Sequence, residues 1–209
     1  MYIMKKILAA LLALVMLLSL AACSEKKSST ASAPTSPEDI ACLYMKAASN
    51  GDFATTESYL IYDPEVLADH RMAALNMSET EFYRMASNQV DTAVTNWRDL
   101  QKAAQKMVRE QMQAQYGDNY AIAVETVSSK SITLEELNSA YGHLLAEAKE
   151  KASVDVSAIT EAKIVTVAGT LRSNNGTETD TSDVVMVKFP DGWKVLDPDA
   201  SIPYMILDF

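Results

Sequence analysis

The sequence predicts an α+β fold in which N-terminal helices pack on an antiparallel sheet, with an extra helix before a C-terminal strand meander. Three observations support this prediction. Apolar residues recur at three-to-four spacing through most of residues 37–116. Two capping boxes mark helix starts, and turn signals separate the apolar runs that follow residue 158. Helical patterns therefore come first and strand patterns come last.

The first helix is predicted to begin directly after Ser36, which is a good N-cap residue. Pro37 suits the first helical position, and the two acidic residues after it complement the helix dipole. The apolar face of this helix consists of Ile40, Leu43, Tyr44 and Ala47. Asn50-Gly51 ends the helix, since this pair favours a turn.

Three further helical segments are expected before residue 117. Short helices are predicted over 54–62 and from Glu65 to about Leu75. The capping box formed by Ser78 and Glu81 then starts a helical stretch over 79–116. That stretch is longer than most helices of globular proteins, so we expect a break at Ser87-Asn88 or at Thr95-Asn96.

Strand patterns dominate the rest of the chain, with one helix among them. Residues 120–127 alternate weakly and favour a strand, and a capping box at Thr133 and Glu136 starts a helix to about Ala152. The meander is predicted as strands over 159–171, 182–189 and 193–196, with a hairpin turn at Asn174-Asn175-Gly176. Residues 202–209 are expected to form an edge strand or to cover one end of the core, because Pro203 disfavours a central strand.

The first 22 residues have the pattern of an export signal. Lys5 and Lys6 precede an apolar run from Ile7 to Leu20, which is shorter than the roughly 20 residues that a bilayer-spanning helix needs. The run ends in Leu20-Ala21-Ala22-Cys23, and this segment resembles the lipobox of bacterial lipoprotein precursors. The resemblance implies that the Cys23 thiol receives a diacylglycerol and that the peptide is cut before it. The alternative is an ordinary signal peptide in which Cys23 is incidental.

The charge balance argues against nucleic acid as a partner. The chain has 18 basic and 28 acidic residues, a formal net charge of −10, whereas nucleic-acid binding requires a basic face. Loss of Lys5 and Lys6 with the signal would take the net charge to −12. Residues 23–36 are rich in Ser, Thr, Ala and Pro and are predicted to be a flexible tether, followed by a single domain over 37–209. The membrane would then be contacted through the lipid on Cys23.

The domain itself resembles the nuclear-transport-factor-two-like, or cystatin-like, superfamily. The resemblance rests on a leading helix that ends in Asn50-Gly51-Asp52-Phe53 and on the terminal Asp191-Gly192-Trp193-Lys194-Val195, and it covers Ser36 to Asp197. It implies a curved, cone-like sheet wrapped around helices. The long helical stretch and the helix over 134–152 exceed the minimal cone, which indicates an insertion or a different fold.

No catalytic motif emerges from the sequence. Two cysteines and two histidines offer little for a disulfide framework or a metal site, and no cofactor motif is found. Four features are candidates for catalysis or metal binding: the Asp69-His70 pair, His143, the free thiol of Cys42, and an acidic group near the C-terminus. For each of them a structural role in capping, packing or solvation is the better interpretation. Trp97 and Trp193 are interpreted as core anchors or cavity walls. The acidic group comprises Asp197, Asp199 and Asp208.

The sequence therefore favours a lipoprotein on the extracytoplasmic face of the cell membrane. Its domain is expected to be non-catalytic and to bind an envelope protein or a small ligand. Fold analogy suggests an alternative, a cavity enzyme of the isomerase or dehydratase type with a buried carboxyl of raised pKa. An accessory solute-binding lipoprotein is a third hypothesis, although the chain is short for the two lobes that such proteins usually have.

Overall fold

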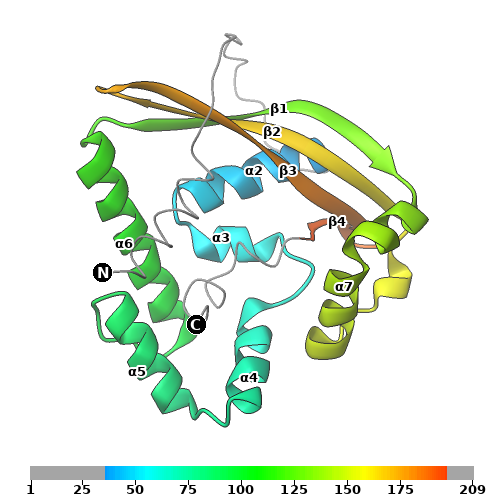
Figure 1. The fold of residues 1–209 in the computed structure, drawn as a ribbon, viewed down its shortest axis with the longest axis horizontal. Coiled ribbons are helices and arrows are strands. Elements are labelled where there is room, and N and C mark those ends of the chain that lie inside the picture. Colours follow the sequence, from blue (N-terminus) through cyan, green and yellow to red (C-terminus); the bar gives the residue numbers. More distant parts are fainter. Residues whose placement is uncertain (1–35, 197–209) are drawn as a thin grey trace.

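The computed structural model describes residues 36–196. One four-stranded antiparallel sheet, in the order β1-β2-β3-β4, forms one layer, and the helices lie on one side of it (Figure 1). The strands are β1 (Ala121–Ile132), β2 (Glu161–Ser173), β3 (Gly176–Phe189) and β4 (Gly192–Val195). The sheet is curved and open, and the predicted α+β class is confirmed.

Within residues 36–196, five helices precede the sheet and one is inserted into it. They are α2 (Pro37–Ser49), α3 (Phe53–Ser58), α4 (Pro64–Ala74), α5 (Glu79–Gln89), α6 (Trp97–Tyr116) and α7 (Leu134–Ala152), and a 3-10 turn, η1 (Val156–Ala158), follows α7. The predicted break in the long helical stretch is present, because residues 90–96 separate α5 from α6. Asn96 then caps α6, its side chain accepting from the Asp99 backbone at 3.0 Å.

Local capping signals located the helix starts correctly. Ser36 Oγ accepts a hydrogen bond from the Asp39 backbone N–H at 3.1 Å, with Pro37 in the first turn. The capping boxes of α5 and α7 are both formed.

Two strands are longer than predicted. The strand expected over 120–127 continues to Ile132, and the strand expected over 182–189 begins at Gly176. Both extensions are polar stretches that lack the apolar alternation of a half-buried strand, and both pair with β2. A register shift between Thr126 and Ser128 marks a bulge in β1. The segment 202–209 and its predicted edge strand lie outside the described residues.

Two apolar clusters form the interior. The first lies between α2, α7 and the sheet, and its fully enclosed members include Tyr44, Val165, Met186 and Val195. The second lies among the helices, around Phe82 and Leu100, and reaches the sheet at Leu171. The helix α3 lies below α2 in Figure 1, between the sheet and the lower helices. Polar groups on α3 therefore lie close to the join between the two clusters.

Candidate functional site

The most unusual polar group in the described part of the chain is the carboxyl of Glu57 on α3. Its Oε2 accepts a hydrogen bond from Trp97 Nε1 at 3.0 Å and one from Gln101 Nε2 at 2.5 Å. Trp97 and Gln101 are one helical turn apart on α6, so both donors face α3. Its Oε1 is enclosed and has no hydrogen-bond partner among the described residues. One oxygen is therefore held by two donors while the other has none.

This environment favours the neutral form of the carboxyl. Burial raises the pKa of Glu57 to about 7, the donors from Trp97 and Gln101 oppose that rise, and the acidic Asp63 and Glu65 add to it. About half of the molecules would hold a proton on Glu57 at neutral pH. A carboxyl group that titrates near neutrality can exchange a proton under physiological conditions, which is a property of many functional carboxyls.

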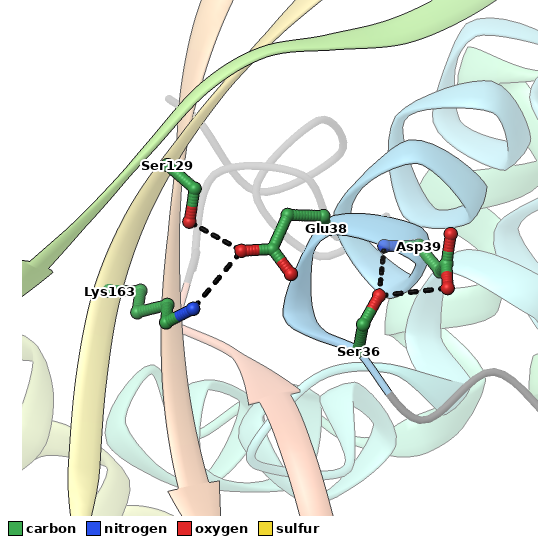
Figure 2. Close-up of polar contacts among 5 residues, drawn as sticks. All are labelled: Ser36, Glu38, Asp39, Ser129 and Lys163. Atoms are coloured by element: carbon green, nitrogen blue, oxygen red, sulfur yellow. Dashed lines mark hydrogen bonds and ion pairs between the residues drawn. The ribbon is translucent and has the colours of Figure 1, made fainter.

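A second polar group joins the first turn of α2 to the sheet. Figure 2 shows Glu38 Oε1 accepting from Ser129 Oγ of β1 at 2.5 Å and from Lys163 Nζ of β2 at 3.1 Å. The Ser129 hydrogen bond is the largest effect that lowers the pKa of Glu38, and Lys163 lowers it further. On the other side of the turn, Ser36 Oγ donates to Asp39 Oδ2 at 2.8 Å (Figure 2). These contacts hold the first turn of α2 against β1 and β2.

Trp193 on β4, interpreted from the sequence as a core anchor or a cavity wall, is buried in the first apolar cluster. Two lysines flank its ring, Lys163 with Nζ 5.9 Å and Lys188 with Nζ 5.7 Å from the ring centroid. Lys188 is also paired with Glu161. Lys163 is in turn paired with Glu38, so each of the two lysines has an acidic partner. Trp97, the other tryptophan, is buried among the helices and donates to Glu57.

A groove of about 340 Å³ runs between α7 and η1. Its wall is mostly apolar, with Leu137 and Leu145 from α7 facing Val156 and Ile159, and Asn138 and Ser157 add polar groups. This mixture of apolar walls and few polar groups is typical of sites for small ligands or for a partner's side chain.

The residues weighed from sequence do not come together. Asp69 and His70 on α4 are exposed, and so is His143 on α7. The Cys42 thiol on α2 is half-buried, not in a disulfide, and lies 3.3 Å from Thr126 Oγ1 of β1. Within residues 36–196 no group of three acidic, histidine or cysteine side chains is arranged to hold a metal ion. Cys23 and the C-terminal Asp197, Asp199 and Asp208 lie outside the described residues.

The sequence analysis missed Glu57. Its partners are 40 and 44 residues away in sequence, so no local spacing could reveal the contact. The available signal was weak: a glutamate on a short segment that also carries the buried Phe53 and Thr56.

Comparison with protein-family models, curated proteins and solved structures gave no match to this chain. Within residues 36–196 no helix is both long and apolar enough to cross a bilayer.

Proposed function

We propose that this chain is a lipoprotein anchored through Cys23 on the extracytoplasmic face of the cell membrane. We further propose that its domain binds a ligand or a protein partner of the cell envelope without catalysis. The observation that carries the proposal is the Leu20-Ala21-Ala22-Cys23 segment at the end of a short apolar run. Two or more acyl chains at about 0.8 kcal/mol per buried methylene would give lasting attachment.

The position of the domain boundary supports this proposal. The polar segment 24–35 would separate the anchor from Ser36, where α2 is capped and its first turn is bonded to the sheet through Glu38. The acidic excess of the chain opposes close contact with anionic lipid headgroups. The domain would then stand off the bilayer with its surface open to partners.

The anchor is tested by expressing the full chain in a bacterial host and measuring the mass of the mature N-terminal peptide. Acylated Cys23 as the first residue is expected, together with recovery in the detergent-rich phase. Cys23→Ser should abolish both results, whereas Cys42→Ser, which removes the other cysteine, should change neither. An unmodified Cys23 in the mature wild-type protein would refute the anchor.

Binding is tested at the groove between α7 and η1. Ala146 lines this groove and is exposed, so Ala146→Trp should fill it, while Ala114→Trp places the same side chain on the exposed face of α6. The lipidated full chain and both variants are purified from detergent-solubilised envelopes. A protein or small molecule that is retained by wild type and Ala114→Trp and lost by Ala146→Trp supports the proposal. Identical recoveries in all three samples would contradict a binding role for the groove.

One observation favours a second candidate function, the cavity enzyme. Glu57 has the raised pKa that a general acid–base group needs at neutral pH. A cavity enzyme would lose turnover in Glu57→Gln, which keeps the shape and removes the proton exchange. If a substrate is found by screening small carbonyl compounds and Glu57→Gln turns it over at the wild-type rate, Glu57 has no catalytic part.

A further inference from the structure

The helix α3 is held from two sides by different kinds of contact. On the sheet side, backbone hydrogen bonds link Tyr59 and Ile61 to Val195 of β4, at 2.8 and 3.1 Å. On the α6 side, the side-chain hydrogen bonds to Trp97 and Gln101 both end on Glu57 Oε2. The backbone bonds are independent of pH, whereas the strength of the contact with α6 depends on whether Glu57 carries a proton.

The ionised carboxylate is poorly accommodated at this contact. Its charge would be spread over two oxygens, and Oε1 is enclosed without a hydrogen-bond donor among the described residues. An enclosed charged oxygen without a partner is costly, and exposure to water removes that cost. Ionisation of Glu57 therefore favours separation of α3 from α6.

The charged groups around Glu57 act in the same direction. Asp63, just before α4, and Glu65, on α4, are both acidic and disfavour a further negative charge. The groups that α6 directs at Glu57 are the uncharged Trp97 and Gln101. Lys102, the residue after Gln101, is exposed and its Nζ lies 3.7 Å from Asp99 Oδ1.

We propose that the contact between α3 and α6 is a proton-controlled latch, closed while Glu57 is protonated and loosened when Glu57 ionises. This inference goes beyond the proposed anchoring and binding function and does not depend on it. The latch operates near neutral pH, because burial raises the pKa of Glu57 to about 7. Opening of the latch would expose the first turn of α6 and the face of α3 that packs against it.

Hydrogen exchange of the full chain, followed by mass spectrometry at pH 5.5 and 8.5 and corrected for intrinsic rates, tests the latch. If Glu57 regains an ordinary pKa when the latch opens, the opening equilibrium of α3 and the start of α6 should rise about 30-fold between these pH values. Glu57→Gln should abolish this rise. Glu110→Gln removes an equal charge from an exposed position on α6 and should leave it unchanged.

A second variant keeps the test valid if Glu57→Gln folds poorly. Trp97→Phe removes one donor that stabilises the ionised carboxylate, so the midpoint of the exchange transition should move to higher pH. A wild-type protein with no pH-dependent rise in α3 would overturn the latch. A rise that persists in Glu57→Gln, or a midpoint unmoved in Trp97→Phe, would also overturn it.

Discussion

Replacement of Gly51 by alanine should destabilise the protein more than a Gly-to-Ala change in an exposed turn would. Gly51 follows the C-cap of α2, is buried, and has a φ of +65°. An added Cβ would lie 2.9 Å from Val108 Cβ and 3.1 Å from Val108 Cγ1 on α6. The substitution therefore combines a left-handed backbone with a steric overlap against a packed helix.

The two contributions can be estimated separately. A left-handed conformation costs an L-residue about 1–2 kcal/mol, and overpacking of a close contact costs about 1–3 kcal/mol. Loss of glycine's freedom in the unfolded chain returns about 0.4–1 kcal/mol. We therefore expect Gly51→Ala to lower the free energy of unfolding by about 1–4.5 kcal/mol.

Denaturant titration followed by tryptophan fluorescence measures this change. Gly169→Ala is the matched control, because its added Cβ meets nothing within 4 Å and its φ is not positive; it should raise the free energy of unfolding by about 0.4–1 kcal/mol. Val108→Ala removes Cγ1 and Cγ2, two of the three atoms that crowd the new methyl group, and keeps Cβ, so it should relieve only part of the cost of Gly51→Ala. A loss below about 1 kcal/mol in Gly51→Ala would refute the steric argument.

The remaining predictions concern charge and core packing. Because the folded-state pKa of Glu57 is raised to about 7 from an ordinary 4.5, its protonated form stabilises the fold at low pH. Stability should fall by about 3 kcal/mol as pH rises from 4.5 to 8.5, and Glu57→Gln should flatten that part of the unfolding profile. The pKa of Glu38 is lowered in the folded protein, so ionised Glu38 stabilises the fold above pH 4.5. This stabilisation is lost as the pH falls through the folded-state pKa. A double-mutant cycle of Glu38→Gln with Lys163→Met should give a coupling of about 0.5–1 kcal/mol at pH 7 and none at pH 2, and equal coupling at both would contradict the ion pair. Phe82→Ala, at a fully enclosed position, should cost about 3–5 kcal/mol in thermal unfolding, and a loss under 1 kcal/mol would show that the helical cluster is not a tight core.

Helix starts were predictable because their signals are local. Ser78 and Thr133 each bond to residues three positions away, so the capping boxes can be identified without knowing the rest of the fold. The break after α5 was predictable for a related reason, since Asn96 is a good N-cap within the long helical pattern.

Strand lengths and the candidate site depended on distant partners. The polar residues 128–131 of β1 become strand because β2 lies beside them, and nothing in their own pattern requires it. The carboxyl of Glu57 becomes enclosed because α6 returns to cover α3, so its raised pKa exists in the folded chain alone. Local sequence determines helix and strand propensities, whereas the burial of a carboxyl group depends on how distant segments pack together.

The contact of α2 with the sheet has a mechanical consequence for a chain held at its N-terminal end. A pulling force applied through residues 24–35 would enter the domain at Ser36 and meet Glu38, which is bonded to β1 and β2. Because α2 also contacts β3 and β4, the load would be distributed over all four strands. Detachment of α2 would therefore require the loss of its contacts with all four strands.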